Sequence, residues 1–156
     1  FDAAVSSLAN QATNFLMEKQ VAKPMGTLHP NIAPYGELFS SLDQKQMVLA
    51  VASNAQFEKL CHILKIEELA ADQRFDSNQK RVRNRSELQL LLSEQIALWK
   101  RSDLMKILID QGVPAGAVRT IEEVFNQKEV DQRLLSESKE GHNLRTVRSN
   151  AFQISS

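Results

Sequence analysis

The chain has 156 residues, of which 42% are hydrophobic and 24% are charged, and its 19 basic and 19 acidic residues leave no net charge. These totals are typical of a folded domain rather than a disordered chain, and the missing basic excess argues against a nucleic-acid partner. No apolar run approaches the roughly 20 residues of a membrane span, so no membrane interaction is expected. The lone cysteine, Cys61, excludes an internal disulfide and predicts a reducing, cytoplasmic location.

The first segment, from Phe1 to about Glu18, is predicted to be one helix because its apolar residues recur at three- and four-residue steps. It has no initiator methionine and no residue that caps its start, which indicates a chain continued from a longer one. Lys23-Pro24 ends the helical prediction, because the residue before a proline disfavours helical backbone angles. The apolar residues are Val5, Leu8, Ala9, Ala12, Phe15 and Leu16.

A loop and a hairpin are predicted next, in the segment from residue 24 to residue 57. This segment holds three of the four prolines, so its first part cannot be regular helix or an inner strand. Two short apolar runs follow, Glu37–Leu42 and Met47–Ala52, and a turn-like segment at residues 43–45 separates them. Such runs predict a β-hairpin with a buried second strand.

Several helices are predicted after the hairpin. Three positions have the spacing of a capping box, in which a Ser or Thr is followed three residues later by Glu or Gln. They predict helices that begin after Ser53, Ser86 and Thr120. A further helix begins at about Ser102 and ends at Gly112, because glycine commonly terminates a helix.

Strand signals in the second half of the chain are weak. Val113–Val118 is short, apolar and broken by proline and glycine, which is typical of an edge strand or an extended segment. The sequence is polar from Lys128 onward, until Leu144–Ile154 shows slight strand character. The predicted fold class is therefore α+β, with a small, mostly antiparallel sheet (the hairpin plus a short strand) packed with several helices.

One ordered set of motifs runs through most of the chain. It starts with Gly26, HPNIAPY at residues 29–35, LAV at residues 49–51 and Gln56-Phe57. It continues through DQRF at residues 72–75, Asn78, RVRNR at residues 81–85 and GVPAG at residues 112–116. This set resembles the class III CoA-transferase family, which includes formyl-CoA and carnitine CoA-transferases and the 2-methylacyl-CoA racemases. The likeness covers the small domain of that fold and its connections.

The resemblance implies a division of the chain and a set of partners. Residues 1–24 would be a linker helix from a missing large domain, residues 25–126 the small α+β domain, and residues 127–156 a return linker. Family members form dimers of interlocked rings, so the missing large domain and a second copy are the expected protein partners. The substrates would be an acyl-CoA and a carboxylic acid, with coenzyme A bound as a thioester substrate and no tightly bound cofactor.

The same resemblance selects the loop before the hairpin as the substrate-facing element. Judged by its residue type alone, a single histidine such as His29 is more often a surface or hydrogen-bonded residue than a catalyst. In the family, however, the corresponding loop closes over the active site. The resemblance therefore implies substrate contacts at Gly26, through backbone freedom, at His29 and Asn31, through hydrogen bonds, and at Tyr35.

The chemistry that the resemblance implies needs an aspartate outside this chain. Class III enzymes attack the donor thioester with an aspartate carboxylate, form a mixed anhydride and then an aspartyl-CoA thioester. That aspartate belongs to the large domain, and neither Asp2 nor Asp43 matches it. No catalytic residue is therefore expected in this chain, which alone is predicted to be inactive.

Two other functions stay open. A racemase of the same family would carry a glutamate just after the LAV strand, where this chain has Ser53-Asn54-Ala55, so the departure favours a transferase. An independent, non-catalytic α+β binding module needs no missing domain and is compatible with the balanced charge.

Three further features are assigned no site. The basic run at residues 80–85 could contact phosphates, but a solvated or inter-helix salt-bridging segment is favoured, because acidic neighbours are numerous. Cys61 and His62 are adjacent on a helix and therefore diverge, and no other residues have metal-ligand spacing, so no metal is expected. His142 lies in a polar tail and is interpreted as solvated.

Overall fold

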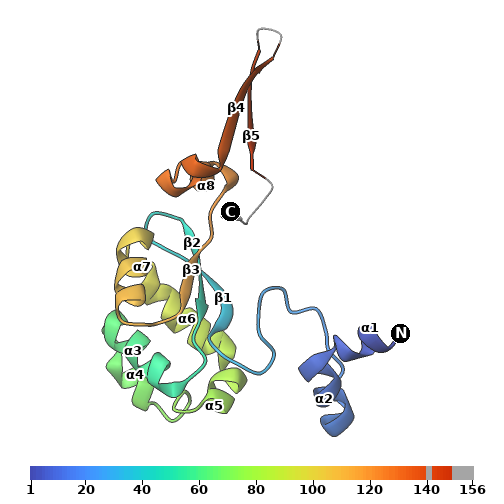
Figure 1. Ribbon diagram of the computed structural model, residues 1–156. Coiled ribbons are helices and arrows are strands. Elements are labelled where there is room, and N and C mark those ends of the chain that lie inside the picture. Colours follow the sequence, from blue (N-terminus) through green and yellow to red (C-terminus); the bar gives the residue numbers. More distant parts are fainter. Residues whose placement is uncertain (140–141, 149–156) are drawn as a thin grey trace. The chain divides into compact units, whose positions relative to one another are not determined.

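The structure is a computed structural model that describes residues 1–139 and 142–148. It divides into two compact units, residues 1–116 and residues 117–156, and its helices and strands are labelled in Figure 1. Helices are combined with two small sheets, which confirms the α+β fold class. Among the described residues, no helix is long and apolar enough to cross a membrane.

The N-terminal segment forms two helices, α1 (Asp2–Ser6) and α2 (Ala9–Glu18), so the prediction of one helix is wrong. The Ser7 hydroxyl donates to the carbonyl of Ala4 over 2.7 Å, and Ala9 has a positive φ of 45°. A serine that bonds back to the preceding turn competes with the helical hydrogen bonds, which accounts for the break. The large apolar side chains of this segment remain exposed: Val5, Leu8, Phe15, Leu16 and Met17.

A loop and the predicted hairpin come next. Residues 19–34, all of them described, contain neither helix nor strand. β1 (Tyr35–Ser40) then pairs antiparallel with β2 (Gln46–Ala50), and Phe39 lies opposite Met47. The register is interrupted near Gly36, whose φ is +85°, as expected for a glycine at a bulge. This irregularity ends the loop and begins the regular strand pairing.

The third strand of this sheet is β3 (Ala115–Ala117), which lies at the edge next to β2. The amide of Ala50 donates to the carbonyl of Pro114 over 3.0 Å, which holds β3 against β2. The edge strand predicted for Val113–Val118 is therefore confirmed.

Five helices follow the hairpin: α3 (Asn54–Leu64), α4 (Glu67–Ala71), α5 (Asn78–Arg83), α6 (Arg85–Ile96) and α7 (Arg101–Asp110). α3 begins with the predicted capping box, in which Ser53 and Gln56 bond each other's backbone amides. The capping box predicted at Ser86 is wrong, because α6 already begins at Arg85. The Asn84 side chain before it donates to the carbonyls of Arg74 and Lys80, which fixes the chain at that turn.

The hydrophobic core lies between the three-stranded sheet and helices α3, α4, α6 and α7. Its side chains come from residues 39–113, so it belongs to the first unit. The largest fully buried apolar members are Phe39, Met47, Leu49, Phe57, Leu60, Phe75, Leu88, Leu92, Ile96, Leu104 and Leu108.

The second unit contains α8 (Ile121–Phe125), which has the predicted capping box at Thr120, and the 3₁₀ helix η1 (Lys128–Arg133). Two strands follow, β4 (Leu134–Lys139) and β5 (His142–Val147), which pair antiparallel. The predicted strand character of residues 144–154 is confirmed up to Val147, and residues 149–154 lie outside the described part. None of the described residues after Gly116 is buried.

Candidate functional site

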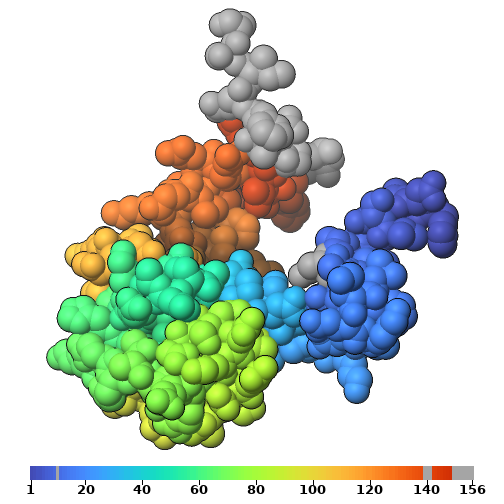
Figure 2. Space-filling view, turned by 90° about the horizontal axis from the view of Figure 1, so that it is seen from below, coloured from blue at the N-terminus to red at the C-terminus, as the bar shows by residue number. Residues whose placement is uncertain are grey.

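The loop expected to face the substrate, residues 24–35, precedes β1 and lies on the surface beside α5 and α6 (Figure 2). At its end Ala33 and Pro34 are buried, whereas Gly26, Asn31 and Tyr35 are exposed. The loop therefore has an anchored end and an outer part that solvent reaches.

Three of the four predicted contacts, His29, Asn31 and Tyr35, meet in the outer part of the loop. The His29 and Tyr35 rings form an edge-to-face contact with centroids 5.3 Å apart. The backbone N–H of Asn31 donates to Nδ1 of His29 over 3.1 Å. Since Nδ1 accepts this hydrogen bond, the neutral imidazole carries its proton on Nε2. The cluster thus contains one ring N–H that can donate to a bound group.

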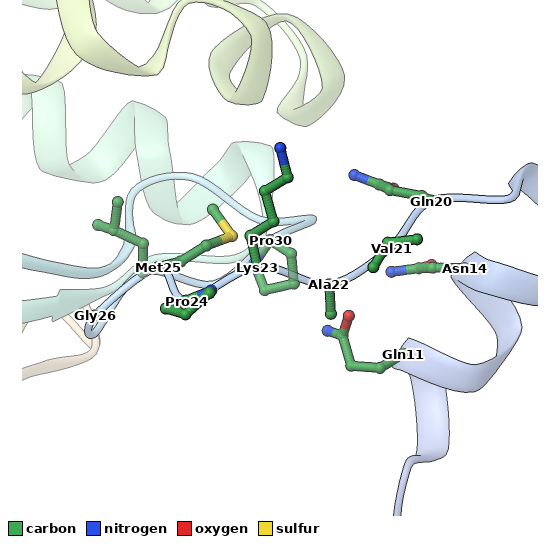
Figure 3. Close-up of a pocket in the computed structure, with 11 residues that line it drawn as sticks. Gln11, Asn14, Gln20, Val21, Ala22, Lys23, Pro24, Met25, Gly26 and Pro30 are labelled. Atoms are coloured by element: carbon green, nitrogen blue, oxygen red, sulfur yellow. The ribbon is translucent and has the colours of Figure 1, made fainter.

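Gly26, the fourth predicted contact, lies apart from that cluster. It lines a groove of about 860 Å³ between α2 and the first part of the loop, and none of the other three does (Figure 3). A Cβ at Gly26 would meet no atom within 4 Å, so the backbone angle φ of +64° explains the glycine better than a close approach does. Most of the groove is formed by Gln11, Asn14, Gln20, Val21, Lys23, Pro24, Met25 and Pro30.

Asn78, in the first turn of α5, bonds the loop through both ends of its amide. Its Nδ2 donates to the carbonyl of Asn31 over 2.7 Å, and its Oδ1 accepts from the amide of Ala33 over 3.1 Å. One side chain therefore replaces the pair of backbone hydrogen bonds that a neighbouring strand would provide.

Arg81 is fully buried, so the prediction of a solvated or inter-helix salt-bridging segment is wrong at this residue. Its Nε donates to the carbonyl of Ala33 over 2.9 Å, and its Nη1 donates to the carbonyl of Phe75 over 3.0 Å. Nη2 donates to Oδ1 of Asn54 over 3.0 Å, and the guanidinium lies 4.6 Å from the centroid of the Phe57 ring. These hydrogen bonds and the ring contact compensate for burying the charge.

Arg85 connects the loop to a buried carboxylate. Its Nη2 donates to the carbonyls of His29 and Ile32, over 2.5 and 2.9 Å, and its Nη1 lies 3.3 Å from Oε1 of Glu37. The Glu37 side chain is 1% exposed, and neither of its oxygens makes a well-formed hydrogen bond. Burial raises the pKa of Glu37, although the positive charge of Arg85 opposes that shift.

Sequence reasoning missed the role of these residues. Asn78, Arg81 and Arg85 follow each other at steps of three and four residues, which places them on one side of a helical segment. That spacing was the available signal. Their partners, however, are backbone carbonyls and amides of a loop more than forty residues away, which no side-chain pattern reveals.

The other reactive side chains have structural roles. Cys61 is buried, which raises the pKa of its thiol to about 12, and His62 Nδ1 lies 2.9 Å from Glu67 Oε1. The Asp43 carboxylate accepts from the Ser41 hydroxyl and the Arg101 amide. Within the described residues, no group of three or more His, Cys, Asp or Glu side chains could hold a metal ion.

The chain is similar to proteins of known activity. The sequence model of CoA-transferase family III matches residues 1–156. Succinate–glutarate CoA-transferase of Agrobacterium fabrum is 36% identical over 132 residues, which are 85% of this chain and 32% of that protein. Human succinyl-CoA:glutarate CoA-transferase is 33% identical over 126 residues, which are 81% of this chain and 28% of that protein. The chain thus spans about a third of these relatives.

A solved structure supports the same relationship. The crystal structure of a CaiB/BaiF family protein from Brucella suis superimposes with a TM-score of 0.76 at 39% identity, over 99% of this chain and 40% of that one. A protein of Mycobacterium tuberculosis, with a TM-score of 0.72 at 21% identity, shares the fold.

Proposed function

This chain belongs to CoA-transferase family III, and from that premise we propose that it is the small-domain part of an enzyme that moves CoA from an acyl-CoA donor to a carboxylic acid. The observation that carries the proposal is the 36% identity to succinate–glutarate CoA-transferase over 85% of this chain. Since the names of that relative and of the human one specify succinate or glutarate, a short dicarboxylic acid is the acceptor class we propose.

The reaction requires more protein than these 156 residues. We propose that residues 1–24 and 127–156 connect the small domain, residues 25–126, to a large domain of a longer cytoplasmic chain that pairs with a second copy in an interlocked dimer. The nucleophile would be an aspartate of that large domain. It would attack the donor thioester to give a mixed anhydride and free CoA, and the CoA thiolate would then attack the aspartyl carbonyl, forming the aspartyl-CoA thioester and releasing the donor's carboxylate. The acceptor carboxylate would attack this thioester in turn, and the released CoA would take the acceptor's acyl group from the second anhydride and restore the free aspartate. One difficult transfer is thereby divided into easier steps.

The role proposed for this chain is to cover the reacting groups with the loop of residues 24–35. Gly26, His29, Asn31 and Tyr35 would contact the substrate. The polar cluster at the exposed part of the loop supports this role, because it presents a hydrogen-bond donor, His29 Nε2–H, and no competing partner for it is present among the described residues.

The test is an assay of the full-length enzyme with succinyl-CoA and glutarate, in which the CoA esters are separated and quantified over time. We expect glutaryl-CoA to form, and much slower transfer to a monocarboxylic acid of similar length. The 156-residue chain alone is the matched control and is expected to form none. Turnover by that chain would contradict the assignment of the nucleophile to the large domain.

The racemase alternative has its own readout in the same preparation. A racemase exchanges the hydrogen next to the thioester carbonyl with solvent, so incubation of a 2-methylacyl-CoA in deuterated water would introduce one deuterium. We expect no exchange. Exchange without CoA transfer would replace the transferase proposal by the racemase.

A further inference from the structure

The loop segment of residues 29–33 has almost no backbone hydrogen bonds of its own. His29 N–H donates to the carbonyl of Tyr35, and no carbonyl from His29 to Ala33 accepts from a backbone amide of the described residues. Four of those carbonyls accept from side chains instead, those of His29, Asn31, Ile32 and Ala33. The conformation of this segment is therefore set by side chains from elsewhere in the chain.

All the donors to those carbonyls come from the backbone clamp, which we define as Asn78, Arg81 and Arg85. The hydrogen bonds from the clamp to the loop all involve main-chain atoms, so they fix the path of the loop without engaging the polar side-chain atoms of His29 and Asn31. It is itself fixed, because Arg81 is fully buried and Arg85 faces the carboxylate of Glu37. Residues fixed in this way can hold the solvent-exposed cluster of His29, Asn31 and Tyr35 in one geometry before a substrate binds, which is what preorganisation requires.

The path of the loop in turn determines the state of His29. The Asn31 amide reaches Nδ1 of His29 only while the backbone keeps its bend between the two residues, and Asn78 holds the Asn31 carbonyl in that bend. Arg85 holds the carbonyl of His29 itself. Loss of these contacts would release the Asn31 amide and leave both imidazole tautomers accessible.

We propose that Asn78, Arg81 and Arg85 are positioning residues that hold His29 in the Nε2–H tautomer, so that this N–H donates to an oxygen of the substrate thioester or carboxylate. The proposal has two parts. Donation from His29 to the substrate rests on the proposed transferase function, whereas control of the His29 tautomer by the clamp does not depend on that function.

The first measurement is nitrogen-15 NMR of the imidazoles in the full-length enzyme, with the His29 signals identified by their loss in the His29→Gln variant. We expect the wild type to show the Nε2–H tautomer and Asn78→Ala to show a mixture. Asn78→Asp, which keeps the acceptor for Ala33 N–H and loses the donor to Asn31, covers the case in which Asn78→Ala does not fold. A wild-type Nδ1–H tautomer, or one unchanged in both folded variants, overturns the role of the clamp.

The second measurement is CoA transfer by the same variants. His29→Ala should lose about tenfold in kcat/KM, the effect of one hydrogen bond of ordinary strength, whereas His29→Gln, with an amide N–H near the Nε2 position, should retain most of it. Asn78→Ala should lose less than His29→Ala, because part of its imidazoles keep the Nε2–H, and the double variant should lose no more than His29→Ala alone, because the clamp acts through His29. Full additivity would overturn this connection, and undiminished transfer by His29→Ala would overturn the donor role.

Lys80→Ala is the matched control for the clamp. Lys80 lies on the same helix as Asn78 and Arg81, but its amine pairs with Asp76 over 2.7 Å at a half-exposed position. Neither the tautomer nor the transfer rate should change in this variant. If the wild type transfers no CoA from any donor, the proposed function fails, and the NMR measurement still decides the role of the clamp.

Discussion

Gly36 is the second residue of β1 and lies at the irregularity of its pairing with β2. A Cβ on Gly36 would lie 1.9 Å from the carbonyl oxygen of Thr27, and its φ of +85° is one that other residues rarely adopt. The glycine is therefore required twice, for its backbone angle and for the close approach of the preceding loop.

Gly36→Ala should lower the free energy of unfolding by about 3 kcal/mol, because strain of a left-handed residue is added to a clash with backbone that cannot move away alone. Gly112→Ala is the matched control: its φ is +68°, but a Cβ there meets nothing within 4 Å. That variant should lose only about 1 kcal/mol. Urea unfolding of the two variants measures the difference, and equal losses would argue against the contact with Thr27.

Glu37 makes stability depend on pH in a predictable direction. Its pKa is raised in the folded state from the ordinary 4.5, mainly by burial, so folding favours the protonated form. The contribution to stability is complete below pH 4.5 and is lost as the pH rises through the folded pKa. Relative to Glu37→Gln, the wild type should therefore become less stable as the pH rises above 4.5 and through the raised pKa of the folded state. Chemical unfolding of both proteins across this range tests the sign, and a constant difference would contradict it.

At the scale of elements, α6 shows how one helix divides its leucines between the core and solvent. Leu92 is fully buried and Leu90, on the opposite side, is 66% exposed. Leu92→Ala should cost about 3 kcal/mol, because it leaves a cavity in the core. Leu90→Ala removes the same atoms from the surface and should cost less than about 0.5 kcal/mol. Thermal unfolding distinguishes the two, and similar losses would mean that Leu90 is covered in the protein.

The elements that the sequence predicted correctly have local signals. Short apolar runs and the turn residues between them identified the hairpin, and the capping boxes at Ser53 and Thr120 identified two helix starts because both partners lie within four residues. β4 was missed because its residues SESK are polar on both faces, so no alternation marks a buried side. The break at Ser7 depends on one hydroxyl that periodicity does not register.

The candidate site was predictable only in part for the same reason. The HPNIAPY motif placed His29, Asn31 and Tyr35 in one loop, and the structure brings these three together. The charge of Arg81 and Arg85 suggested solvent, whereas both are enclosed by the carbonyls of a loop distant in sequence. Hydrogen bonds from distant side chains to the backbone of the loop cannot be predicted from the residue types of the loop.

At the scale of the whole molecule, the core is confined to the middle of the chain. Its members lie within residues 39–113, and the described residues after Gly116 contribute none. Deleting residues 119–156 should therefore change the free energy of unfolding of the 156-residue chain by less than about 1 kcal/mol. Deleting residues 101–156 removes α7 with Leu104 and Leu108 and should abolish cooperative unfolding. Equal behaviour of the two truncations, followed by circular dichroism, would contradict this division.

The rate at which the Cys61 thiol is labelled reports how often the core opens. It is the only cysteine, its sulfur is inaccessible, and a pKa of about 12 leaves almost no thiolate at neutral pH. A thiol reagent therefore reacts with Cys61 only when the interior opens. The labelling rate of the folded chain divided by that of the unfolded chain gives the equilibrium fraction of molecules in which the core is open. Leu92→Ala should accelerate labelling about a hundredfold, in proportion to its loss of stability. An unchanged rate would mean that reagent reaches Cys61 through smaller fluctuations, which leave the packing around Leu92 intact.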